Sequence, residues 1–380
     1  MKIVFVSNFL NHHQIPICKE YLRLADEFWF VSTDSGGSQG FQVNTEAEYV
    51  LHYDMKEDND KAVQKIIDAD IAIMGSCPNE LVELRAKTNK LTYIYSERLF
   101  KNGIWRRFIP RTRKRIKERF LKCSDKNVYV LAASAYLPFD LSLIGFPLNK
   151  VLKWGYFPQC KEYENIEELI NNKKKHSILW VGRFLQWKHP EYAIGAVYLL
   201  KKRGYSVELN MIGEGECFCK ISDMIKKLSL EDCVFLHGSK DSVTVRSFME
   251  KSEVFLFTSD KKEGWGAVLN EAMNSGCAVV ASDGTGAAPW LIEHKKNGMI
   301  YKSGNVNDLF LKTKMLLDDC DMQRSIGREA YLTIKDQWNE KNAAERLVDI
   351  SKNLIEHKDY EFQSGVCSKV PIIKNRFVKN

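Results

Sequence analysis

Short apolar runs alternate along the chain with longer segments in which apolar residues recur at helical spacing. In the first half, helices are predicted over His13–Leu24 and Lys61–Asp68, and the apolar runs between them predict strands. The strands are expected over Ile3–Ser7, Phe28–Ser32, Ile71–Met74, Leu91–Tyr95 and Val128–Ala132. Such alternation of strands and helices indicates a doubly wound parallel sheet.

The second half of the chain repeats this pattern. Strands are predicted over Ile178–Val181, Val207–Ile212, Val234–Leu236 and Val254–Phe257, and helices over Pro190–Lys202, Cys219–Leu228 and Ser242–Lys251. Between the halves, residues 161–176 are charged and lack strand character, so we expect a linker there. The predicted fold class is α/β, with two doubly wound, Rossmann-like domains that face a cleft, because parallel sheets bind ligands at the carboxyl ends of their strands.

Composition narrows the class of protein. The 380 residues are 44% apolar, which suffices for two hydrophobic cores. No apolar run is long enough to cross a bilayer, and the first residues, MKIVFVSNFL, are typical of a strand and not of a secretion signal. The ten cysteines form no CxxC pair, and the net charge of +7 does not by itself indicate nucleic acid. We therefore expect a cytoplasmic protein with reduced cysteines.

The segment that follows the predicted strand Val254–Phe257 carries the most informative chemistry. Gly264 and Gly266 open a helix at a strand-to-helix turn, where free backbone N–H groups attract anions such as phosphate. Glu263 precedes this turn, and Glu271 lies further along the helix. A plain βαβ packing unit explains the glycines but not the carboxylates. The combination suits a phosphorylated, hydroxyl-rich ligand.

Two cations follow the predicted strand Ile178–Val181. Arg183 and Lys188 share one short loop, which suits a diphosphate, although exposed loops commonly carry such residues without any ligand. Gly213 follows the next strand, and a lone glycine pair at such a position is weak evidence.

Five motifs, found along the second half of the chain in the expected order, resemble those of the retaining glycosyltransferases of family GT4, which adopt the GT-B fold. They are VGRF-x₃-KHPE, IGEGE, HGS, EGWGAVLNEAMNSGCAVVAS and NGMIY. The resemblance implies that Arg183 and Lys188 bind the donor diphosphate and that Glu263 lies beside the donor sugar. It also implies that Glu271 accepts hydrogen bonds from the ribose hydroxyls.

By the same resemblance, the donor site includes Gly213 and the backbone amides of Gly264, Trp265 and Gly266. Trp265 departs from the usual phenylalanine, and we expect it to alter the sugar pocket. The resemblance implies domains at residues 1–165 for the acceptor and 176–337 for the donor. It also implies a helix within 338–357 that crosses back to the first domain, followed by a basic tail at 358–380.

Negative charge develops on a departing diphosphate, and fixed cations together with a helix N-terminus stabilise it without a metal. The Asp-x-Asp motifs at residues 58/60, 68/70 and 319/321 are interpreted as solvated carboxylates without a metal. We therefore predict no metal and no cofactor, with a UDP- or GDP-sugar as the donor substrate.

The acceptor side is expected in the first half. His12 and His13 follow the first strand, and Glu97 and Arg98 follow the strand Leu91–Tyr95. Alternatively, Asn11 caps a helix beside a surface histidine pair, and Glu97 forms an ion pair with Arg98 or another cation.

Residues 101–122 hold ten lysines and arginines, one acid and interleaved aromatic residues. This composition suits an anionic membrane surface, although it also fits nucleic acid or a solvated helix whose apolar side joins the core. A lipid-linked acceptor favours the membrane over nucleic acid as a partner.

The hypothesis is a retaining, metal-independent glycosyltransferase that moves a hexose-type sugar to a glycan or lipid-linked acceptor in capsule, O-antigen or exopolysaccharide biosynthesis. It would be cytoplasmic and peripheral at the inner face of the cell membrane. The alternatives are a phosphorylase or epimerase on the same fold, a non-catalytic nucleotide- or glycan-binding partner subunit, and a nucleic-acid-binding protein.

Overall fold

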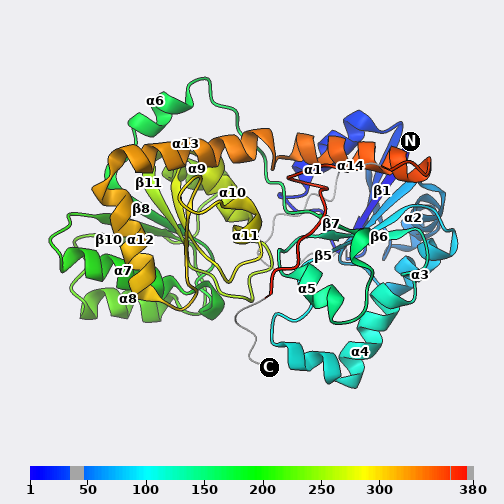
Figure 1. Ribbon diagram of the computed structural model, residues 1–380, viewed down its shortest axis with the longest axis horizontal. Helices are drawn as coiled ribbons and strands as arrows, with labels where there is room; N and C mark the ends of the chain where they lie inside the picture. The colour runs from blue at the N-terminus through cyan, green and yellow to red at the C-terminus, as the bar shows by residue number, and fades with distance from the viewer. Residues whose placement is uncertain (35–46, 360, 375–380) are drawn as a thin grey trace. The chain divides into compact units, whose positions relative to one another are not determined.

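The computed structural model describes residues 1–34, 47–359 and 361–374. The chain divides into two compact units, which we call unit 1 (Met1–Gln159 with Trp338–Asn380) and unit 2 (Cys160–Gln337). Each unit is built on its own sheet, and every pair of neighbouring strands is parallel (Figure 1). The predicted α/β class with two parallel sheets is therefore confirmed.

The sheet of unit 1 has the order β3-β2-β1-β4-β5-β6-β7. Its strands are β1 (Lys2–Ser7), β2 (Glu27–Ser32), β3 (Val50–His52), β4 (Ile71–Met74), β5 (Thr92–Ser96), β6 (Val128–Ala132) and β7 (Val151–Lys153). Every residue of β4 is buried, as expected of a central parallel strand that is covered on both faces. The order of the strands reverses between β1 and β4, so the connections leave these two neighbours in opposite directions.

The helices of unit 1 come from both ends of the chain. They are α1 (Ile15–Leu24), α2 (Lys56–Asp68), α3 (Asn79–Lys87), α4 (Pro110–Ile116), α5 (Leu137–Ser142) and α14 (Glu340–Ile355), with short turns η1 (Ile104–Phe108), η2 (Lys117–Leu121) and η3 (Leu148–Lys150). Helix α14, the segment expected to cross back, packs on α1, and the hydroxyls of Tyr93 and Ser351 share a 2.8 Å hydrogen bond. In the tail, the buried Cys367 donates its backbone N–H to the carbonyl of Lys153.

The sheet of unit 2 has the order β10-β9-β8-β11-β12-β13 and reverses between β8 and β11. Its strands are β8 (Lys174–Val181), β9 (Glu208–Ile212), β10 (Val234–Leu236), β11 (Ser252–Phe257), β12 (Ala278–Ser282) and β13 (Met299–Tyr301). Its helices are α6 (Ile166–Asn171), α7 (Pro190–Lys201), α8 (Phe218–Lys227), α9 (Ser242–Lys251), α10 (Ala267–Asn274), α11 (Ala288–Leu291), α12 (Val306–Asp318) and α13 (Cys320–Asp336), with the short turn η4 (Gln186–Lys188).

Alternate residues of these strands build the core of unit 2. Ile178 and Trp180 of β8, with their counterparts on the neighbouring strands, join one buried cluster with apolar residues of α7, α8 and α12. Figure 1 shows these three helices on one face of the sheet, and α9, α10 and α13 on the other. The two-residue period of a strand thus explains why each face has its own set of helices.

The segment predicted to be a linker, residues 161–176, is instead structured. The side chain of Asn165 accepts a 3.1 Å hydrogen bond from the backbone of Glu168 and so caps α6, and β8 already begins at Lys174. Lys174 and Lys175 are exposed at the start of β8, and Lys174 pairs with Glu208 of β9. The charged residues gave no strand signal, because the start of β8 forms by pairing with β11, where Lys174 lies opposite Ser252, and not through local hydrophobicity.

A stability prediction follows from Gly213, directly after β9. Gly213 has φ +132°, and a Cβ there would lie 2.0 Å from the carbonyl oxygen of Gly182. We expect Gly213→Ala to lower the free energy of unfolding by roughly 3 kcal/mol, through backbone strain and overpacking. Gly204, with φ +82° and open space around it, is the control, and Gly204→Ala should cost only about 1 kcal/mol. Equal losses in urea denaturation would contradict this packing.

Candidate functional site

An ion pair marks the carboxyl edge of the sheet in unit 2. Lys188 ends the turn η4 after β8, and its ammonium pairs with the carboxylate of Glu263, in the loop after β11. The two side chains are only 14% and 15% exposed. Because β8 and β11 are the neighbours between which the strand order reverses, the loops that follow them open a site at this edge.

Buried hydrogen bonds hold the Lys188 loop against the end of β11. The hydroxyl of Thr258 donates to the carbonyl of Lys188 at 2.6 Å and accepts from the indole N–H of Trp180 at 2.8 Å. The backbone N–H of Asp260 donates to the carbonyl of Trp187 at 2.8 Å. The sequence analysis missed Thr258, although a polar residue at the end of an apolar strand was the available signal.

His189 adds a second positive charge next to Lys188. Its Nδ1 lies 2.8 Å from Glu191 and its Nε2 lies 3.4 Å from Asp260, while its ring stacks on Tyr192. Burial disfavours the charged imidazole, but the hydrogen bonds to Asp260 and Glu191 outweigh burial and raise the pKa of His189 to about 9. His189 is therefore protonated at neutral pH.

The glycine turn after β11 is buried, and so is the aromatic residue between its two glycines. Gly266 has φ +94° and precedes α10, and a Cβ at this position would lie 2.2 Å from the ring of Phe257. The side chain of Trp265 is fully buried, and its Nε1 donates to Asn270 at 2.9 Å. The expectation that Trp265 alters a sugar pocket is therefore corrected: its indole packs in the core beneath the turn.

Glu271 lies on α10, beyond the glycine turn. Burial raises the pKa of its carboxyl to about 6, and Arg246 opposes this shift. Arg246 also donates to the carbonyl of Glu271 at 3.3 Å and to the side chain of Asn274 at 2.8 Å. The carboxylate is therefore ionised at neutral pH and able to accept hydrogen bonds.

Arg183 and Gly213 lie at the same edge of this sheet. Gly213 packs against the backbone of Gly182, and its N–H donates to the carbonyl of Gly238 at 2.9 Å. Arg183 follows Gly182 and is exposed. The structure thus brings Lys188 and Glu263 into direct contact. Arg183 lies in the same loop after β8, and its side chain is exposed to solvent.

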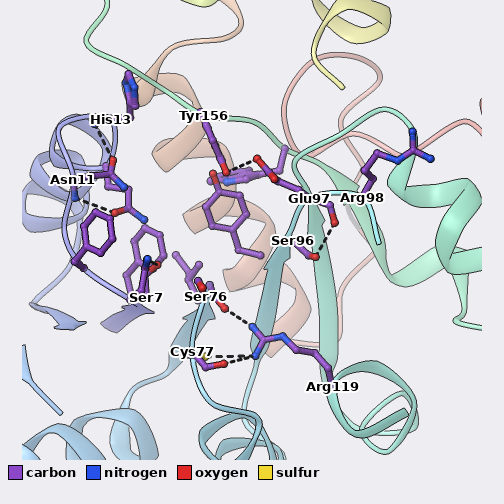
Figure 2. Close-up of a pocket in the computed structure, with 18 of the residues that line it drawn as sticks. Ser7, Asn11, His13, Ser76, Cys77, Ser96, Glu97, Arg98, Arg119 and Tyr156 are labelled. Carbon is purple, nitrogen blue, oxygen red and sulfur yellow. Dashed lines mark hydrogen bonds between the residues drawn. The ribbon is translucent and has the colours of Figure 1, made fainter. Parts of the chain in front are cut away.

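Unit 1 has a pocket of about 670 Å³ at the carboxyl ends of β1, β4, β5 and β7 (Figure 2). Its centre is a carboxylate with two partners. The hydroxyl of Tyr156 donates to Glu97 at 2.7 Å, and Lys101 pairs with the other oxygen of the same carboxylate. Tyr95 packs edge-on against Tyr156, so aromatic rings surround the charged group. The sequence analysis missed Tyr156, because it follows a strand of only three residues. The ion pair with Lys101 bears out the alternative that Glu97 pairs with a cation.

The predicted acceptor residues separate into two groups. His13 lines the pocket with Glu97, and burial followed by the charge of His12 lowers the pKa of His13 to about 3, so its imidazole is neutral. Its backbone N–H donates to the side chain of Asn11 at 3.0 Å. The alternative that Asn11 caps the helix is wrong, because the N-cap of α1 is Gln14 and no side chain caps this helix. His12 is exposed and does not line the pocket.

Arg98 differs from its neighbour Glu97. Figure 2 shows Glu97 turned toward Tyr156 and Arg98 turned away from both. The fully buried guanidinium lies 3.5 Å from Asp140, which in turn accepts the backbone N–H groups of Leu99 and Phe100. Arg98 thus lines the pocket while its guanidinium is directed toward Asp140, which indicates that it supports the position of the β5 end.

The basic segment 101–122 has two sides. Ile116 and Phe120 are buried, and Arg119 donates to the carbonyls of Gly75 and Cys77 beside the pocket. Trp105 and Phe108, in contrast, are 61% and 66% exposed. The predicted core role of the apolar side therefore holds only for the second part of this segment.

Within residues 1–34, 47–359 and 361–374, no group of three or more His, Cys, Asp or Glu side chains is placed to hold a metal ion. In the same part of the chain, no helix combines the length and apolar character that a membrane span requires.

Residues 162–333 match the family model described as "Glycosyl transferases group 1". The amylovoran biosynthesis glycosyltransferase AmsK of Erwinia amylovora is 26% identical over 288 residues, or 74% of this chain and 68% of that protein. A 4-alpha-N-acetylgalactosaminyltransferase of Campylobacter jejuni, named for a diphospho-undecaprenol substrate, is 31% identical over 162 residues, or 43% of this chain and 43% of that protein.

Among solved structures, Anabaena Alr3699/HepE in complex with UDP has a TM-score of 0.68 at 16% identity, over 94% of this chain and 99% of that one. This likeness concerns the fold. Together, the comparisons confirm the resemblance to GT4-like proteins: residues 162–333 match the glycosyltransferase group 1 model, and the fold is that of the GT-B structures.

The charge on His189 generates a prediction about pH. A folded-state pKa of about 9, above the ordinary 6.5, stabilises the fold fully below pH 6.5, and this contribution is lost as the pH rises through 9. We expect the free energy of unfolding to fall by roughly 2 kcal/mol over that range. His189→Gln should abolish this fall in urea denaturation, whereas an unchanged slope would show that His189 is not the group responsible.

Proposed function

We propose that the protein is a retaining glycosyltransferase that transfers a hexose-type sugar from a UDP- or GDP-sugar bound in unit 2. The ion pair of Lys188 with Glu263, beside the glycine turn, is the observation that carries this proposal. Lys188, Arg183 and protonated His189 would oppose the negative charge of the departing diphosphate, aided by the N-terminus of α10. Because these groups stabilise the negative charge of the leaving diphosphate, the proposed reaction needs no metal. The UDP bound to Anabaena HepE supports a uridine donor.

The proposed acceptor is a glycan, free or linked to a lipid, that binds in the unit 1 pocket. Glu97 accepts hydrogen bonds from hydroxyl groups, and the rings of Tyr95 and Tyr156 offer apolar faces against which a sugar ring can pack. The names of the Erwinia and Campylobacter relatives support a role in polysaccharide assembly, with a polyprenyl diphosphate as one carrier.

A thermal-shift screen against UDP-, GDP-, ADP- and dTDP-sugars tests the donor, since ligands that bind the native state raise its melting temperature. We expect a UDP- or GDP-sugar to stand out. Glu271→Ala should weaken nucleotide binding about tenfold or more, through loss of hydrogen bonds to a charged group. Wild-type affinity should also fall as the pH drops through about 6, where the Glu271 carboxyl becomes protonated.

The control variant for this screen is Tyr156→Phe in unit 1. It should keep the nucleotide-induced rise in melting temperature and reduce sugar transfer to the acceptor. Normal nucleotide affinity in Glu271→Ala would remove the proposed role of that residue, and a wild type that responds to no nucleotide-sugar would refute the donor assignment.

We further propose that the exposed side of segment 101–122 binds an anionic membrane surface, at the cytoplasmic face of the cell membrane. Trp105 and Phe108 project from a surface that also carries the exposed cations Arg113, Lys114 and Arg115. Interfacial aromatic residues next to lysines and arginines are typical of membrane-surface binding.

Flotation with phosphatidylglycerol vesicles tests this surface. Neutralising Arg113, Lys114 and Arg115 together should reduce the bound fraction at least about tenfold, because each cation near an anionic surface contributes ~1 kcal/mol. The double substitution Trp105→Ser and Phe108→Ser should also reduce it. Val243→Ser, at a 79% exposed site in unit 2, is the matched control and should float like the wild type. Unchanged flotation of the triple variant would refute the membrane proposal.

A further inference from the structure

The contact between Lys188 and Glu263 raises a question about the donor site that the proposed function leaves open. The resemblance assigns the ammonium to the diphosphate and the carboxylate to the sugar, yet in the structure the two groups neutralise each other. Each is mostly buried, so the pair is only weakly screened by water. A diphosphate can reach Lys188 fully only when it replaces Glu263 as the partner.

The backbone on both sides of the pair is fixed. Thr258 holds the carbonyl of Lys188, and the backbone N–H of Glu263 donates to the carbonyl of Asp260 at 3.0 Å. Asp260 itself is tied to the Lys188 loop through the carbonyl of Trp187. An exchange of partners therefore requires only rotation of the two side chains about their own bonds, without movement of the loops.

We propose that Glu263 is the internal counterion of Lys188, which the donor diphosphate displaces, and that it thereby selects nucleotide-sugars over nucleoside diphosphates. This inference rests on the proposed function. When the diphosphate takes the ammonium, the carboxylate loses its partner and accepts hydrogen bonds from the hydroxyls of the donor sugar. A nucleoside diphosphate without sugar displaces Glu263 in the same way but offers the carboxylate no donor.

The exchange also acts after the reaction. Once the sugar has left, the carboxylate has no hydroxyl to accept from and lies beside a negatively charged product. Its return to Lys188 competes with the diphosphate and favours release of the product. No covalent step or proton transfer is required, because both groups keep their charges throughout.

Calorimetric titration with UDP, GDP, UDP-glucose and GDP-mannose tests this inference. Glu263→Gln keeps the shape of the side chain and removes its charge, so we expect UDP or GDP to bind about five- to tenfold more tightly. The matching nucleotide-sugar should gain less, because it also loses a charged hydrogen-bond acceptor. Glu263→Ala should also increase the affinity for UDP or GDP. This variant has no amide, so it shows whether the glutamine amide itself contributes to the effect.

A double-mutant cycle identifies the partner. In a Lys188→Met background, Glu263→Gln should change nucleotide affinity less than it does in the wild type, because competition for the ammonium is gone and only the repulsion between carboxylate and diphosphate remains. Glu208→Gln, which breaks an ion pair with Lys174 at the opposite end of the sheet, is the matched control and should leave affinity unchanged.

Two results would overturn the inference while leaving the proposed function in place. One is that both Glu263 variants bind UDP and GDP no more tightly than the wild type. The other is that Glu263→Gln raises the affinity for these nucleotides equally with and without Lys188. A folded wild type that binds none of the four ligands would overturn both.

Discussion

The parallel pairing of β8 with both β9 and β11 is the constraint on which the candidate donor site depends. It aligns the carboxyl ends of three strands, so that the loops after them emerge at one edge. Because the strand order reverses between β8 and β11, the chain leaves these neighbours toward opposite faces of the sheet. The loops that carry Lys188 and Glu263 meet at this edge. The same reversal between β1 and β4 accompanies the pocket of unit 1.

Both candidate sites combine cations with paired carboxylates. The edge of unit 2 gathers Lys188, Arg183 and protonated His189, and Glu263, Asp260 and Glu191 meet part of this charge. In the pocket of unit 1, a phenol and an ammonium hold the carboxylate of Glu97 in place, and further arginines line the same pocket. Aromatic rings beside Glu97 support the proposal that this pocket takes the acceptor.

Local pattern sufficed for several elements. The bounds predicted for β4, β6, β10 and α9 are those of the structure. Burial is nearly complete in β4 and β6 but only partial in β10 and α9, so the pattern of apolar positions, and not full burial, carried these predictions. It failed for β3, β7 and β13, each of three residues, which exist only because a longer neighbour pairs with them. It also failed for the start of β8, where charged residues hide a paired strand.

The sequence by itself determined the fold class, the family resemblance and the position of the cation- and glycine-bearing loops, because these depend on residue types at fixed local spacing. Only the tertiary structure decided which side chains meet. Arg98 and Glu97 are adjacent in the chain, yet one is buried against Asp140 and the other points to Tyr156. Trp265 lies in the core, where its indole donates to Asn270, although the sequence placed it at the edge of a sugar pocket. The partners in these contacts, like Lys188 and Glu263, lie far apart in the sequence, and only the packing of the whole sheet places them side by side.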